Sequence, residues 1–154
     1  MITLFGKGTT LNDIEHGFIR GDKKHVGSRN NFNEPRIHFA VNCASIGCPA
    51  LLNEPFTAAK MEQQLETATK NFLMDSSRNN FNVKTKTWEH SSIFKWYKGD
   101  FEKGHKGHTS LKKFVQNYVD AATTNPAAKA IINSGNFKTK PHPDGYNWNL
   151  NDKI

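Results

Sequence analysis

The sequence predicts an α+β fold in which a short antiparallel sheet packs against several amphipathic helices. Two patterns support this prediction. Short segments alternate apolar and polar residues, as strands do, and longer segments repeat apolar residues every three or four positions, as helices do. The chain has 154 residues, of which 36% are hydrophobic and 23% are charged. These values are typical of a globular protein, and the length suits one domain spanning residues 1–154.

Two short elements are expected in the first part of the chain. Residues 2–5 are typical of a strand, and Thr9 or Thr10 can cap a short helix over residues 11–18. That helix is predicted because apolar residues recur there at helical spacing. The polar, Asn-rich stretch 19–33 is expected to be a loop.

The segment from Arg36 to Asn42 is predicted to be a buried strand. Ile37, Phe39 and Val41 alternate with their neighbours along it. Side chains two positions apart share a face of a strand, so these three are expected to point into the core.

The rest of the chain is predicted to supply most of the helices. Apolar stripes, Ser or Thr caps, and a Pro-first, Gly-last pattern indicate helices over 57–74, 91–97, 110–122 and 126–135. A short hairpin and a final strand are expected over 80–83, 87–89 and 146–150.

The charge and hydropathy patterns exclude some classes of function. The net charge is +7, but the basic residues are scattered in pairs such as Lys23-Lys24. Without an Arg-rich stripe or an aromatic-basic motif, we predict a solvated surface and no specific nucleic-acid partner.

No apolar run approaches the roughly 20 residues of a membrane span. The start, MITLFGKGTT, lacks the parts of a signal peptide. We therefore expect a soluble protein; its compartment and oligomeric state stay open.

The junction between the predicted strand and the following loop carries the most distinctive chemistry. On that strand His38 and Asn42 share a face, and Cys43 follows where the small-residue loop ASIG begins. A base within reach, an amide to orient it and free backbone N–H groups favour an activated thiolate. Positions 38 and 43 lie an odd number of residues apart, so on a strand their side chains would point to opposite faces. His16 is therefore the alternative base. Asp100 is a further candidate to orient a histidine.

The second cysteine leaves two other interpretations open. A disulfide between Cys43 and Cys48 would close a tight loop and is credible in an oxidising compartment. Alternatively, both cysteines with His16 or His38 would bind zinc, although C-x2-C is the more usual spacing. Apart from this alternative, no metal and no cofactor is predicted.

These observations predict a thiol-dependent hydrolase or acyl transferase with Cys43 as the nucleophile. The expected substrate is an amide or thioester, in a peptide or a small molecule. Arg36, Arg20 and Ser45 are the candidate substrate-binding residues. The alternatives are a non-catalytic module that binds a ligand or protein, with a structural Cys43–Cys48 disulfide, and a zinc site.

Four blocks of the sequence resemble the family called domain of unknown function 547. They are LNDIEHGFIR, EPRIHFAVNCASIGCPAL, SSIFKWYKGDF and DGYNWNLND. The blocks keep their order and spacing, and the second is the most specific of the four.

The resemblance implies a fold similar to that of papain-like or transglutaminase-like thiol enzymes. It implies Cys43 as nucleophile, His38 or His16 as base, and Asn42 or Asp100 as the orienting residue. Family members carry an upstream helix rich in aromatic residues and Asn, so we expect this chain to lack that section. Bacterial members are often exported, which would favour the disulfide.

Overall fold

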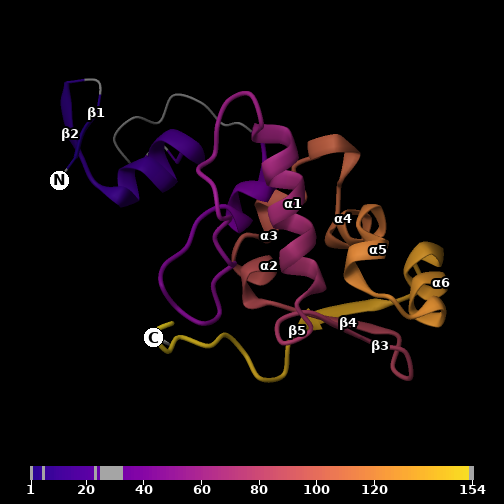
Figure 1. Ribbon diagram of the computed structural model, residues 1–154. Helices are drawn as coiled ribbons and strands as arrows, with labels where there is room; N and C mark the ends of the chain where they lie inside the picture. The colour runs from indigo at the N-terminus through magenta and orange to yellow at the C-terminus, as the bar shows by residue number, and fades with distance from the viewer. Residues whose placement is uncertain (1, 5, 23, 25–32, 153–154) are drawn as a thin grey trace. The chain divides into compact units, whose positions relative to one another are not determined.

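The computed structural model describes residues 2–4, 6–22, 24 and 33–152 of the chain. The chain divides into two compact units, Met1–Glu34 and Pro35–Ile154. Figure 1 shows the helices and strands of both units, and the α+β class predicted from the sequence is confirmed. None of the helices within the described ranges has the length and apolar character needed to cross a membrane.

The first unit contains a hairpin and a short helix. β1 (Ile2–Leu4) pairs antiparallel with β2 (Lys7–Thr9), which confirms the predicted strand over residues 2–4. Thr10 caps the helix that follows, because its Oγ1 accepts a hydrogen bond from the Asp13 N–H at 3.1 Å. The helix η1 (Asp13–Ile19) has the wider π-helical spacing. Residue 5 and most of the expected loop over 19–33 lie outside the described residues.

The second unit contains a three-stranded mixed sheet. β3 (Asn80–Asn82) pairs antiparallel with β4 (Thr87–His90), which confirms the predicted hairpin. β5 (Lys138–Pro141) pairs parallel to the other edge of β4, and the three strands lie side by side in Figure 1. The sequence KTKP of β5 lacks the apolar alternation that would have predicted this strand.

The segment Pro35–Phe39 is a 3₁₀ helix, η2, and the prediction of a strand over residues 36–42 is wrong. In a 3₁₀ helix residues three positions apart share a face. Arg36 and Phe39 are therefore buried together against the next helix: Phe39 stacks on Phe72 at 4.9 Å, and Arg36 pairs with Glu62 at 2.7 Å. Alternation over so few residues does not distinguish this arrangement from a strand.

The next helix, α1 (Met61–Met74), begins later than its predicted cap at Thr57. A separate turn precedes it, in which the Lys60 N–H donates to the Thr57 carbonyl at 3.1 Å. Of the predicted apolar stripe Met61 is exposed, whereas these residues are buried as predicted: Leu65, Ala68, Phe72 and Leu73.

The remaining helices are short, and local signals fix most of their ends. They are α2 (Ser92–Trp96), α3 (Lys98–Phe101), η3 (His105–Gly107), α4 (Leu111–Asn117), α5 (Val119–Ala122) and α6 (Pro126–Ser134). The predicted caps Ser91 and Ser110 both accept a backbone N–H. Gly135 ends α6 with a φ of 73°, as predicted. The helix expected over 110–122 is divided at Tyr118.

Aromatic rings form the centre of the core of the second unit. The Phe94 ring lies 4.9 Å from that of Trp88, 4.9 Å from that of Phe101 and 5.8 Å from that of Phe114. All four are fully buried. Because Phe94 belongs to α2 and Phe101 to α3, the core fixes both helices, and with them the exposed Trp96 and the half-buried Asp100.

Candidate functional site

The side chain of Asn42 shapes the loop over residues 42–49, called here the cysteine loop, which follows η2. Its Oδ1 accepts the N–H of Ala44 at 2.6 Å, and its Nδ2 donates to the carbonyl of Pro49 at 2.7 Å. Both ends of the loop are thus tied to one amide, and Ala44 adopts a φ of 62°. These contacts make Asn42 a loop-shaping residue, whereas the sequence predicted that it would orient a histidine.

The two cysteine sulfurs share the same hydroxyl groups. Cys43 is exposed and Cys48 is buried, and both are free thiols, so the expected disulfide is not formed in the structure. The Ser45 hydroxyl lies 3.5 Å from the Cys43 sulfur and 3.4 Å from that of Cys48. The Tyr146 hydroxyl lies 3.7 Å and 3.2 Å from the same two atoms. One polar cluster therefore contains both sulfurs.

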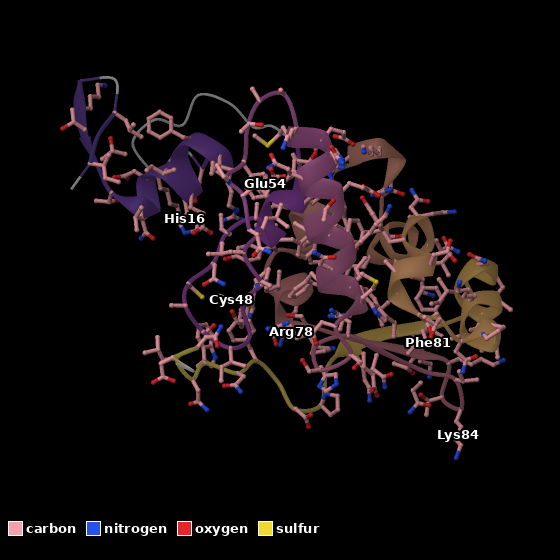
Figure 2. All side chains as sticks on the ribbon, viewed as in Figure 1. His16, Cys48, Glu54, Arg78, Phe81 and Lys84 are labelled. Carbon is pink, nitrogen blue, oxygen red and sulfur yellow. The ribbon has the colours of Figure 1, made fainter. Side chains whose placement is uncertain are left out.

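The sulfur of Cys48 receives the stronger set of hydrogen bonds. The backbone N–H of Cys43 points at it from 3.0 Å, and Tyr146 donates to it. The Ser45 hydroxyl is also 3.0 Å from the Tyr146 oxygen, so its single proton serves either that oxygen or the sulfur. Figure 2 labels Cys48 on its loop.

These hydrogen bonds lower the pKa of the Cys48 thiol to about 7. Burial acts in the opposite direction, because it penalises the thiolate. The bonds from the Cys43 thiol, Ser45, Tyr146 and the Cys43 N–H outweigh that penalty. Burial and the Cys48 hydrogen bond raise the pKa of Tyr146, which therefore stays protonated. Near neutral pH the cluster thus contains a thiolate and a hydroxyl donor.

Arg78 supplies a positive charge next to this cluster. Burial lowers the pKa of its guanidinium, and the charges of Tyr146 and Cys48 act to raise it. Its Nη2 donates to the carbonyl of Ile46 in the cysteine loop, and its Nη1 pairs with Asp75. Arg78, labelled in Figure 2, therefore joins the end of α1 to the loop and favours the thiolate electrostatically.

A segment about a hundred residues downstream holds the loop in place. The N–H groups of Ile46 and Gly47 both donate at 2.9 Å to carbonyls of the segment 147–149, and Leu150 forms a β-bridge with Ser45. The strand expected over 146–150 is reduced to this pairing. A Cβ at Gly47 would lie 2.9 Å from the Tyr146 ring, so the close approach requires glycine there.

A cavity of about 580 Å³ opens beside the cluster. Its lining is mainly polar and includes Arg78, Ser77, Asn147 and Asn149. Trp148, which also lines it, is 68% exposed. The rings of Trp148, Tyr146 and Trp96 lie within 5.4 Å of one another, centroid to centroid. The site thus has an aromatic surface at its edge and a volume typical of small-ligand pockets.

His38 is paired with Asp100, as expected for a histidine and its orienting carboxylate. The His38 Nε2 lies 2.9 Å from Asp100 Oδ2, and the imidazole stacks on the Tyr97 ring at 3.9 Å. His38 is only 2% exposed. Among the described residues, the hydrogen bonds of the Cys43 sulfur do not include a histidine. The structure therefore pairs His38 with Asp100 and, in the part of the chain that it describes, places no histidine in hydrogen-bond contact with the Cys43 sulfur.

Of the other predicted residues, Ser45 contacts both sulfurs. Arg36 is 1% exposed, and its ion pairs with Glu62 and Glu66 hold η2 against α1. This makes it a structural residue rather than a ligand for a substrate. Arg20 and His16 belong to the first unit, where Arg20 Nη1 lies 2.9 Å from His16 Nδ1.

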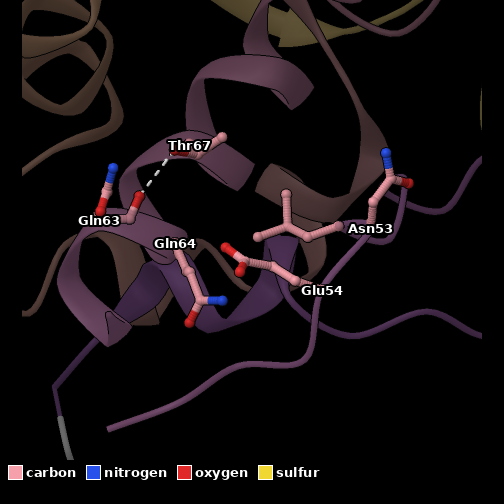
Figure 3. A pocket seen from close by; sticks show the side chains of 6 residues that line it. Asn53, Glu54, Gln63, Gln64 and Thr67 are labelled. Carbon is pink, nitrogen blue, oxygen red and sulfur yellow. Dashed lines mark hydrogen bonds between the residues drawn. The ribbon is translucent and has the colours of Figure 1, made fainter. Parts of the chain in front are cut away.

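A second, smaller cavity of about 350 Å³ lies between the segment 52–54 and the start of α1 (Figure 3). Gln64 lines it, but both ends of its amide are used: Oε1 accepts the N–H of Thr57, and Nε2 donates to the Pro55 carbonyl. Thr67 likewise donates to the Gln63 carbonyl. These polar groups of the cavity are therefore used in hydrogen bonds that hold the neighbouring backbone.

The described part of the chain contains no group of three or more His, Cys, Asp or Glu side chains arranged to hold a metal ion. The zinc alternative predicted two cysteines with His16 or His38. The structure instead places the two cysteines with a serine and a tyrosine.

Sequence reasoning missed Tyr146 and Arg78, and it treated Cys48 only as a disulfide partner or zinc ligand. Tyr146 lies in the block DGYNWNLND, for which the sequence predicted a strand and a family resemblance but no site residue. Arg78 carries no local motif. Their proximity to Cys48 depends on contacts between segments far apart in the sequence, which no local pattern encodes.

Comparisons with known proteins agree with the resemblance. No curated protein and no solved structure matches the chain. The model of a family described as "Protein of unknown function, DUF547" matches residues 1–73. This range includes η1, η2 and both cysteines, whereas the blocks containing Asp100 and Tyr146 lie beyond it. Over its first 73 residues, the chain is therefore similar to the DUF547 family.

Proposed function

We propose that this protein is a thiol-dependent hydrolase or acyl transferase, in which Cys43 attacks a carbonyl carbon and Cys48 holds the negative charge of the pair. One observation carries the proposal. The exposed sulfur and the buried sulfur contact the same two hydroxyls, Ser45 and Tyr146. A proton can therefore pass between the two sulfurs within one cluster.

In the proposed reaction the ionised Cys48 accepts the proton of the Cys43 thiol. The Cys43 sulfur forms a bond to the carbonyl carbon, and the bond to the leaving amine or thiol breaks as that group takes the proton from Cys48. Water or an acceptor then attacks the resulting thioester, giving its proton to Cys48. The Cys43 sulfur leaves and recovers that proton, which restores the starting pair.

The proposal also assigns a role to the exposed position of Cys43. A substrate larger than water can reach Cys43 from solvent, whereas Cys48 is 4% exposed. The cavity lined by Arg78 and Trp148 lies beside the cluster and would hold the rest of the substrate. His38 and Asp100 would then stabilise η2 and α3 instead of carrying the proton.

Acylation by p-nitrophenyl acetate and by an acetyl thioester tests the proposal. Intact mass should show one acetyl group on the wild-type protein, and none on Cys43→Ser. Cys48→Ala retains Cys43 and should be acylated at least tenfold more slowly at pH 7, because the proton acceptor is lost. Tyr118→Phe, which removes a hydroxyl bonded to Glu66, is the matched control and should react normally. Acetyl groups on Cys43→Ser at the wild-type rate would refute the proposal.

We propose, as a second candidate, a ligand-binding module with the cysteines in a structural role. The exposed rings of Trp96 and Trp148, together with the half-buried Tyr146 ring beside a polar cavity, favour it. Mass spectrometry without reductant separates the candidates. A Cys43–Cys48 crosslink in freshly isolated protein that glutathione does not reduce supports the binding module, whereas two free thiols support the enzyme.

A further inference from the structure

The geometry points to a peroxide-reactive thiol pair, in which hydrogen peroxide oxidises Cys48 and Cys43 then closes a disulfide with it. The inference concerns the same two sulfurs as the proposed enzyme, but it requires no acyl substrate and stands independently. Three features carry it: the hydrogen-bond donors around one sulfur, the difference in exposure between the two, and the hydroxyls that both share.

The first feature is the arrangement around the Cys48 sulfur. A backbone N–H at 3.0 Å and the Tyr146 hydroxyl at 3.2 Å point at this atom from separate segments of the chain. Donors of this kind stabilise a thiolate. Tyr146 also has the proton that a departing hydroxide needs when the O–O bond of a peroxide breaks. Within the described ranges, the hydrogen bonds of the Cys43 sulfur are with two hydroxyls and include no backbone N–H.

The second feature is selection by size. Cys48 is 4% exposed, so a bulky electrophile is kept from its sulfur. Hydrogen peroxide is little larger than water, and the cavity lined by Gly47 and Tyr146 reaches the immediate neighbours of Cys48. Cys43 is exposed, so a larger reductant can reach the disulfide from that side.

The third feature is the position of the second sulfur. The Ser45 and Tyr146 hydroxyls lie 3.5 and 3.7 Å from the Cys43 sulfur, and 3.4 and 3.2 Å from that of Cys48. Because both sulfurs contact the same two oxygen atoms, a bond between them requires only a local adjustment of the loop.

The chemistry balances with hydrogen peroxide as oxidant and a low-molecular-weight thiol as reductant. The Cys48 thiolate attacks one peroxide oxygen, the O–O bond breaks, and the other oxygen leaves as water after taking a proton through Tyr146. The Cys43 sulfur attacks the sulfenic acid, an S–S bond forms, and the hydroxyl leaves as a second water with the Cys43 proton. Two molecules of glutathione then restore both thiols and form one glutathione disulfide.

The test begins from reduced protein and one equivalent of hydrogen peroxide at pH 7. The wild type should lose two hydrogen atoms in intact mass and yield a Cys43–Cys48 peptide, which glutathione reverses. Cys43→Ala should retain the sulfenic acid, seen as a gain of one oxygen atom at Cys48 in intact mass and peptide mapping. Tyr146→Phe should oxidise about twofold to fivefold more slowly, because the thiol is less ionised. Tyr118→Phe should match the wild type.

Two results would overturn the inference. One is that Cys43 of Cys48→Ala gains an oxygen atom from peroxide as fast as Cys48 of Cys43→Ala does. The other is that stoichiometric peroxide leaves both wild-type thiols free. Neither result depends on acylation, so the peroxide reaction and the acyl-transfer proposal can fail separately.

Discussion

Replacing Tyr146 by Phe removes one hydrogen bond to the Cys48 sulfur while keeping the ring that packs on Gly47. A hydrogen bond to a charged group contributes about 1.5–3 kcal/mol. The low end applies here, because the Ser45 hydroxyl, freed from Tyr146, can donate fully to the sulfur. Since about 1.4 kcal/mol equals one pKa unit, the pKa of the Cys48 thiol should rise from about 7 to about 8.

The direct assay is a pH titration of thiolate absorbance in the ultraviolet. Reaction rate at a single pH is a poorer measure. At pH 7 the thiolate fraction would fall about fivefold, but the intrinsic nucleophilicity would rise by about threefold for a Brønsted slope of 0.4–0.5. The net change in alkylation rate is thus only about twofold. Tyr118→Phe is the control and should leave the thiol titration unchanged. An unaltered titration in Tyr146→Phe would show that Tyr146 does not stabilise the thiolate.

Three further outcomes follow from the described contacts. Gly47→Ala forces its Cβ against the Tyr146 ring, so the free energy of unfolding in urea should fall by about 1–3 kcal/mol and the thiol pKa should rise. Hydrogen bonds from Arg36 and Lys106 lower the pKa of Glu62 to about 2, so the stability that they give is present above pH 4.5 and is lost as the pH falls towards 2. Arg36→Met should reduce this acid dependence in a series of denaturation curves. Burial lowers the pKa of His90 below 6.5, so the folded state binds fewer protons and stability should decrease as the pH falls through 6.5. His90→Gln should remove that contribution, and an unchanged slope would contradict it.

Local signals in the sequence predicted much of the helical structure. Ser91, Ser110 and the Pro126 to Gly135 pattern act through hydrogen bonds and backbone angles within a few residues, so their effect can be recognised without the fold. The prediction of a strand over 36–42 was wrong because the conformation of this segment depends on contacts with residues far along the chain. Burial of Arg36 against Glu62 is a tertiary interaction, and a charged residue in an alternating segment is more typical of a solvent-facing position.

The candidate site was predicted in place but not in detail. The sequence pointed to the loop that contains Cys43 and Cys48, and it anticipated that Asp100 would accompany a histidine. It did not predict the hydrogen-bond donors around Cys48, because they come from a turn within the loop and from Tyr146, far along the chain. Whether a thiol is protonated or ionised depends on such contacts, which the spacing of residues in the sequence does not specify.

The segment 147–151 pairs with the cysteine loop, and this pairing can open and close while the rest of the protein stays folded. Residues 147–151 are exposed, and a few backbone hydrogen bonds to residues 44–47 hold them. Such a segment separates at a lower free energy than that of global unfolding. Each separation removes Tyr146 from Cys48 and returns the sulfur to ordinary thiol behaviour. Hydrogen exchange at the amides of Ile46 and Gly47 should therefore measure the fraction of time during which the pair is reactive.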